Sequence, residues 1–106
     1  MQSSEALQDV IRERQRQLAS EGFSLERDDQ YKLGELAAAG GRYALFAQSP
    51  KFHREALNIA GNPKLGAPFG WPWSKDWFKP TDCRRDLVKA AALIVAEIER
   101  LDRIPK

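Results

Sequence analysis

The stretch "RDLVKAAALIVAEIERLDR", residues 85–103, decides the fold class, because apolar residues recur in it at helical spacing. The apolar face consists of Leu87, Ala90, Ala91, Ile94, Val95, Ile98 and Leu101. This face predicts a helix that begins near Thr81 or Asp82, ends near Arg103 and packs on a core. Glu99 and Arg103 are spaced for an exposed ion pair on the same helix.

A second amphipathic helix is expected near the start of the chain, from about Ser4 to Ser20. Its apolar stripe would consist of Leu7, Val10, Ile11 and Leu18. The intervening "RERQRQ", residues 12–17, is interpreted as a solvated face.

Two further helices are expected in the middle of the chain. One would run from Gln30 or Leu33 to Gln48, with a cap at Asp28 or Asp29. It contains "AAAGG", residues 37–41, and each interior glycine costs about 1 kcal/mol, so a backbone or a ligand is expected to approach closely there.

The next helix would start at Ser49 and Pro50 and stop at Gly61 and Pro63, and residues 61–80 would form a long loop. No segment alternates with period two. The sequence therefore predicts one compact all-α domain over residues 1–106, with three or four helices and frayed ends at 1–3 and 104–106.

Composition restricts the function classes. The chain has 106 residues and a formal charge of +2, which is too small to predict nucleic-acid binding. Cys83 is the only cysteine, so no intramolecular disulfide is possible and a reducing, cytoplasmic setting is expected. No apolar run reaches the length of about 18 residues that a membrane helix needs, so no membrane partner is expected.

The strongest candidate site is "GWPWSKDWFKPTDCRRD", residues 70–86. Its three tryptophans, at positions 71, 73 and 77, offer flat surfaces on which a base can stack at about 1–3 kcal/mol. Lys79, Arg84 and Arg85 would hold phosphate near a helix N-terminus. The alternative is that Trp71, Trp73 and Trp77 complete the core while the arginines pair with Asp28, Asp29 or Asp86.

A second candidate is "RDDQYKLGEL", residues 27–36. Asp28, Asp29 or Glu35 could accept hydrogen bonds from ribose hydroxyls, and Tyr31 lies among them. The alternative is a capped helix start without a ligand role.

Catalysis has weaker support. His53 and Cys83 show no spacing typical of a nucleophilic site, and no Cys or His pair has zinc-ligand spacing. Glu99 and Asp102 have the Glu-x-x-Asp spacing found in MazG-type all-α nucleotide pyrophosphohydrolases, which use such pairs to hold Mg²⁺. The first acid pair of that family is missing here, so a solvated face is favoured, with no metal and no cofactor.

The sequence shows two resemblances, of which the first covers about Val10 to Arg103. "RERQRQLASEGFSLERDDQYKLGELAAAGGRYAL" and "WPWSKDWFKPTDCRRDLVKAAALIVAEIERLDR" resemble a family of small proteins encoded by tailed phages and prophages. "EGFSLERDD", the proline-rich aromatic connection and the last helix are more faintly similar to the ryanodine-receptor (RyR) repeat domain.

These resemblances imply a function that composition alone does not. Bacterial RyR-type domains are proposed sensors of adenine-nucleotide signals. A phage protein of this type would sequester an immune signalling molecule in the host cytoplasm without turning it over, such as a cyclic ADP-ribose variant or a cyclic nucleotide. The rival role is inhibition of a host protein through the tryptophan loop. The small residues 37–41 and the alanines of the last helix also suit close helix packing, either within the chain or across a dimer, and a homodimer is expected.

Overall fold

The computed structural model describes residues 4–20, 24–47 and 71–105 of the chain. Within these residues the fold is all-helical and has no strand, which confirms the predicted fold class. The elements are α1 (Glu5–Ser20), α2 (Leu25–Asp28), α3 (Glu35–Ala47), the 3-10 turn η2 (Lys75–Trp77) and α5 (Cys83–Asp102). The helix expected at Ser49 and the loop before residue 71 lie outside the described residues.

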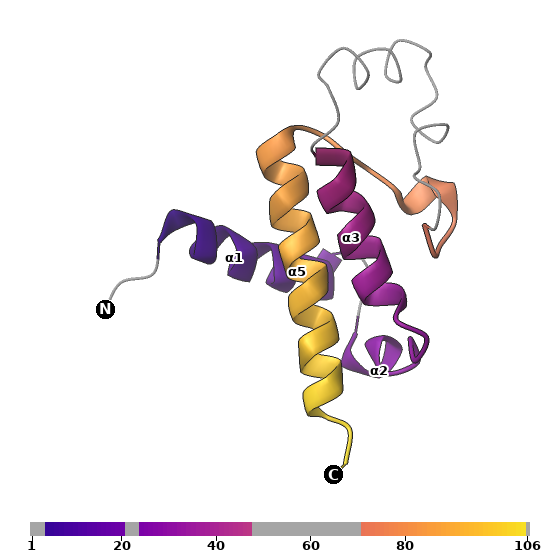
Figure 1. Ribbon diagram of the computed structural model, residues 1–106. Helices are drawn as coiled ribbons and strands as arrows, with labels where there is room; N and C mark the ends of the chain where they lie inside the picture. Colours follow the sequence, from indigo (N-terminus) through magenta and orange to yellow (C-terminus); the bar gives the residue numbers. More distant parts are fainter. Residues whose placement is uncertain (1–3, 21–23, 48–70, 106) are drawn as a thin grey trace.

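Helices α3 and α5 lie side by side and form the center of the molecule (Figure 1). The core between and beside them is built from Leu36, Ala39, Tyr43, Phe46, Phe78, Ala90, Leu93 and Ala96. A Cβ at Gly40 would lie 2.9 Å from the carbonyl oxygen of Ala90, so only glycine fits at this crossing. The expected close approach is thus confirmed at Gly40 and occurs within the chain, whereas Gly41 faces open space.

Helix α1 crosses behind α5, and its N-terminal half projects away from the other helices (Figure 1). Its buried side is polar and consists of Glu13, Arg14 and Gln17. Leu7 and Ile11 are exposed instead. The prediction of a solvated "RERQRQ" face was therefore right for Arg12 and Gln15, which are exposed, and wrong for the three buried residues. The reason is that partners from distant segments neutralise the buried charges.

Arg14 shows how this neutralisation works. Its guanidinium lies 2.9 Å from Asp28 and 2.9 Å from Glu99, and both Arg14 and Asp28 are buried. Since Glu99 is taken by Arg14, the expected pair between Glu99 and Arg103 does not form. Arg103 instead binds Asp29 at 2.7 Å.

Helix α5 follows its predicted limits closely. Asp82 is its N-cap and accepts a hydrogen bond from the backbone N–H of Arg85 at 2.8 Å. Asp86 is buried and accepts from the backbone of Thr81 at 2.8 Å. The predicted apolar face was only partly right, because Ala90 is buried while Leu87 is half exposed. The buried side is turned toward Val88, Ala92, Leu93 and Ala96.

The segment before α3 differs from its prediction. The sequence did not predict the short helix α2, which is capped by Ser24, whose hydroxyl accepts from the backbone N–H of Arg27 at 3.0 Å. The expected cap of the longer helix by Asp28 or Asp29 was wrong, because Asp28 is the buried last residue of α2 and Asp29 is the C-cap of that same helix. Helix α3 starts at Glu35, after Gly34 with a φ of +81°, a conformation that favours glycine.

None of the described helices combines the length and the apolar character needed to cross a membrane.

Candidate ligand-binding site

The aromatic segment of residues 71–80 folds back onto α3 and completes the core. The Trp71 ring packs edge-on against Tyr43 and Trp73, with ring centers 5.5 Å apart in both pairs. Phe78 is buried 5.0 Å from Trp71, and Trp73 also packs on Tyr31 at 5.3 Å. Trp71 and Trp73 are therefore partly core residues, while Trp77 is exposed.

The same rings form one wall of a small, partly open hollow with a volume of about 40 Å³. The C-terminal half of α1 and residues of α3 and α5 form the other walls. The described residues that line it are Glu13, Arg16, Gln17, Tyr43, Trp71, Trp73, Trp77, Lys79, Lys89 and Leu93. Aromatic surface and charge thus meet in one place, and we call this the aromatic hollow.

Two lysines place positive charge beside the rings of the aromatic hollow. The Lys79 ammonium lies 5.6 Å from the center of the Trp77 ring, and the Lys89 ammonium lies 5.7 Å from that of Tyr43. Lys89 also donates to the carbonyl oxygen of Lys79 at 2.6 Å. Burial lowers the pKa of Lys89, although the charge of Asp86 partly opposes this effect.

Glu13 forms the charged floor of the aromatic hollow. Its carboxylate accepts two hydrogen bonds from Arg16 at 2.8 Å and is also bound by Arg85. Burial raises the pKa of Glu13, but the hydrogen bonds and charges of Arg16 and the charge of Arg85 outweigh it, so the pKa lies below its ordinary value. Glu13 is therefore ionised at neutral pH and does not act as an acid there.

Gln17 supplies the one buried acceptor of the hollow that lacks a described partner. The side chain is 4% exposed, and its amide nitrogen donates to Glu13 at 3.1 Å. Because a carboxylate only accepts, this bond fixes the amide orientation. The Oε1 atom is then buried without a hydrogen-bond partner among the described residues. Such an atom costs about 1–3 kcal/mol, which a donor on a ligand would offset.

The structure brings part of the predicted site together. Trp71, Trp73, Trp77 and Lys79 line the aromatic hollow. Tyr31 adjoins it through Trp73, and its hydroxyl accepts from Arg27 at 2.8 Å. Arg85 reaches its floor through Glu13.

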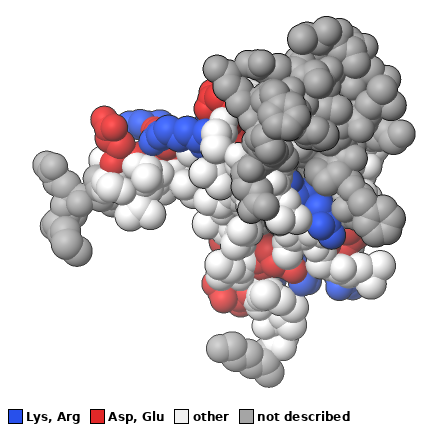
Figure 2. All heavy atoms as spheres, turned by 45° about the horizontal axis from the view of Figure 1, so that its top comes forward, with Lys and Arg blue, Asp and Glu red and all other residues white. Residues whose placement is uncertain are grey.

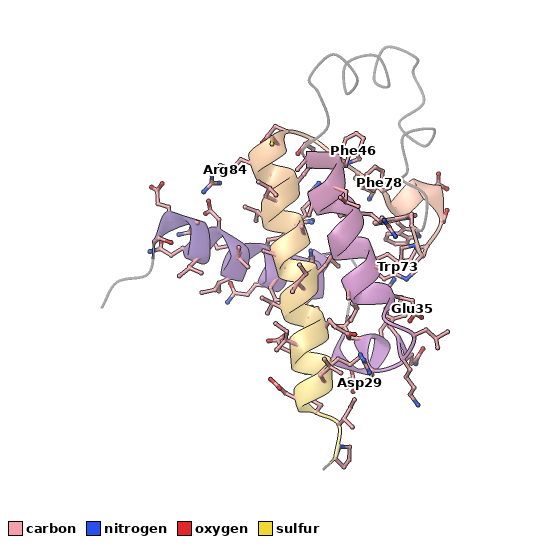
Figure 3. All side chains as sticks on the ribbon, viewed as in Figure 1. Asp29, Glu35, Phe46, Trp73, Phe78 and Arg84 are labelled. Atoms are coloured by element: carbon pink, nitrogen blue, oxygen red, sulfur yellow. The ribbon has the colours of Figure 1, made fainter. Side chains whose placement is uncertain are left out.

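The other predicted residues lie elsewhere. Arg84 is exposed and pairs with Asp9 at 2.9 Å, and Figure 3 shows Arg84 and Trp73 on opposite sides of the α3–α5 pair. Arg84 and Arg85 are thus bound by Asp9 and Glu13 of α1. The predicted partners Asp28, Asp29 and Asp86 do not bind them. Asp28 is bound to Arg14 and Asp29 to Arg103, while Glu35 accepts from the backbone of Leu33 at 2.7 Å.

Six residues that line the hollow were not predicted from the sequence, namely Glu13, Arg16, Gln17, Tyr43, Lys89 and Leu93. Glu13 and Gln17 are one helical turn apart, as are Arg85 and Lys89. This spacing indicates a polar face on α1 and another on α5, but it does not indicate that the two faces are in contact.

A second hollow lies at the end of α5 and is lined by Asp29, Lys32, Arg100, Arg103, Ile104 and Pro105. It is larger and more open, and its described lining has no aromatic ring. Its guanidiniums are already paired, Arg103 with Asp29 and Arg100 with Glu97. The aromatic hollow is the better candidate for a ring-bearing ligand.

Across residues 4–20, 24–47 and 71–105, no group of three or more His, Cys, Asp or Glu side chains could hold a metal ion. No protein-family model matches the chain, and neither a curated protein nor a solved structure is significantly similar to it.

Proposed function

We propose that this protein binds a small anion that carries an aromatic ring, of the nucleotide-derived class, and does not turn it over. One observation carries the proposal: a single hollow joins the rings of Trp77 and Tyr43 to the ammonium groups of Lys79 and Lys89. Aromatic faces bind bases by stacking, and lysine ammoniums bind phosphate as point charges.

Each group of the hollow has a role in this proposal. The half-exposed Trp77 ring stacks on the base, since Trp71 and Trp73 are held by the core, and the ligand shares the Trp77 ring with the Arg27 and Lys79 cations, which lie 5.7 and 5.6 Å from its center. Lys79 and Lys89 hold the phosphate. The amide oxygen of Gln17 accepts an N–H of the ligand. Arg84, Asp28, Asp29 and Glu35, which the sequence suggested, have no part in it.

The biological setting that we propose comes from the sequence resemblances. A phage-encoded binder of this kind would sequester a cyclic ADP-ribose-type or cyclic nucleotide signal in the host cell. The rival hydrolase needs Glu99, which the structure pairs with Arg14 at 2.9 Å. The rival protein inhibitor would use the exposed Trp77 as its contact.

The test is a thermal-shift screen against nucleotides, cyclic dinucleotides and cyclic ADP-ribose isomers, followed by chromatography of each incubated compound. A ligand at 100 times its Kd stabilises the fold by about 2.7 kcal/mol, a shift that such a screen detects. We expect a shift with the ligand recovered intact. A new product would support an enzyme, and no shift with any compound, but capture of a host protein, would support the inhibitor.

Matched variants locate the site. Lys89→Met keeps the length of the side chain and removes its charge, and we expect it to weaken binding at least about tenfold, which is about 1.4 kcal/mol. Lys32→Met is the control, because Lys32 lines the second hollow. Loss of binding in the Lys32 variant alone would place the ligand in the second hollow and contradict the proposal.

A further inference from the structure

Burial divides the aromatic hollow into an inner and an outer end. Glu13 and Gln17 are 1% and 4% exposed and form the inner end. Trp77 is 43% exposed and Lys79 is also exposed, and these residues form the outer end. A ligand that enters from solvent therefore meets a ring and a cation first, and a buried carboxylate and amide last.

The volume of the hollow determines what can reach its inner end. A space of about 40 Å³ holds only a few atoms, since one water alone needs about 10–15 Å³. A whole nucleobase does not fit in this space, so its ring has to stay at the outer end, against Trp77. Only a substituent of the ring can extend to Gln17.

The inner end requires that this substituent is a hydrogen-bond donor. The amide nitrogen of Gln17 donates to the Glu13 carboxylate, so the amide oxygen Oε1 remains as a buried acceptor without a partner among the described residues. Glu13 supplies no donor, because its pKa lies below the ordinary value and the carboxylate is ionised. A substituent that only accepts, such as a carbonyl group, would leave Oε1 unsatisfied.

The charge of the lining determines which kind of donor is suitable. Of the described lining residues, three are cations, namely Arg16, Lys79 and Lys89, and only Glu13 is an anion. This excess of positive charge repels an ammonium group but not a neutral amino group. The amino group of a nucleobase is small, neutral and a donor of N–H hydrogen bonds. It therefore meets all three requirements of the inner end.

The charged side chains on the outside of α1 offer little selectivity of their own. In the view of Figure 2, basic and acidic side chains lie side by side along α1. A surface of mixed charge does not distinguish one phosphate-bearing ligand from another. Selection between ligands that carry the same phosphate therefore depends on the inner end of the hollow.

Building on the proposed function, we propose that the aromatic hollow selects nucleotides whose base carries an exocyclic amino group, and that Gln17 is the residue that selects it. The ring stacks on Trp77, and the amino group donates to Oε1 of Gln17. Oε1 is closed off from solvent, so the long lysine side chains of the hollow shift slightly to admit the amino group.

Isothermal titration with two matched pairs of nucleotides tests this proposal. Adenosine monophosphate and its cyclic form carry the amino group, and the corresponding purine riboside phosphates carry a hydrogen in its place. We expect each adenine compound to bind at least about tenfold more tightly than its purine counterpart, because loss of the donor leaves Oε1 unsatisfied. Equal affinity within both pairs would overturn the selection and leave nucleotide binding intact. Binding of none of these compounds would contradict the proposed function as well.

A substitution at Gln17 provides the second readout. Gln17→Met keeps the length of the side chain and removes the acceptor, so we expect the preference for the amino group to fall below about twofold. Gln15→Met is the matched control, because Gln15 is exposed on the same helix and should keep the full preference. A preference that persists in Gln17→Met would overturn the role of Gln17. Far-UV circular dichroism confirms that each variant is folded.

Discussion

Helix α5 is packed in two different ways. Against α3 it meets Leu36 and Ala39 in an apolar contact, with Gly40 allowing the close approach. Against α1 it meets charges, through Glu99 with Arg14 and Arg85 with Glu13. The first contact is stabilised by removal of apolar surface from water and responds weakly to pH. The second depends on every buried charge keeping its partner.

The largest loss in the free energy of unfolding is expected when only one partner of a buried ion pair is removed. Arg14→Leu would leave Asp28 buried without its counter-ion, and we expect a loss of about 3–5 kcal/mol in the free energy of unfolding, measured by urea denaturation.

The double variant Arg14→Leu with Asp28→Leu is the informative control. It removes both charges, so we expect it to recover most of the loss. A double variant that is no more stable than Arg14→Leu would show that the packing of Arg14, rather than its charge, holds α1.

The second-largest loss in the free energy of unfolding is expected from a substitution in the apolar contact between α3 and α5. Leu36 is fully buried between α3 and α5, so Leu36→Ala should cost about 2–5 kcal/mol through lost burial and a cavity. Leu33→Ala is the matched control, because Leu33 is 92% exposed and its change should stay within about 0.5 kcal/mol. Equal losses in both variants would contradict the placement of the core.

Acid should weaken the α1 contact and leave the α3 contact intact. The pKa of Glu13 is lower in the folded chain than its ordinary value of 4.5, so the unfolded chain binds more protons as pH falls below that value. The stability from Glu13 is present above pH 4.5 and is lost as pH falls through the folded pKa. We expect thermal melts at acidic pH to show a steeper loss for the wild type than for Glu13→Gln. Parallel slopes would contradict a charged Glu13.

Local pattern predicted the parts of the fold that local chemistry determines. The length of α5 and its cap at Asp82 follow from periodicity and side-chain hydrogen bonding within a few residues. The burial of Arg14 could not be predicted in this way, because its partner Glu99 lies 85 residues away. A hydropathy pattern assigns every charged residue to the surface, and it contains no information about a partner that is distant in the sequence.

The residues of the candidate site form the same two groups, those that are close in the sequence and those that only the fold brings together. The tryptophans and Lys79 stood together in the sequence, and the structure keeps them together. Gln17 and Lys89 come from separate helices, and only the tertiary fold brings them to the tryptophans. Proximity to a helix start suggested Arg84 as well, but its side chain points to the far side and binds Asp9.

The span of the Arg14 contacts has a consequence for biosynthesis. Arg14 emerges from the ribosome early, while Glu99 follows only after 85 more residues have been added. Local helices form within microseconds, whereas translation adds about 5–20 residues per second. The charged side of α1 therefore stays hydrated for several seconds. The docking of α1 on α5 is one of the last events in the maturation of each new chain.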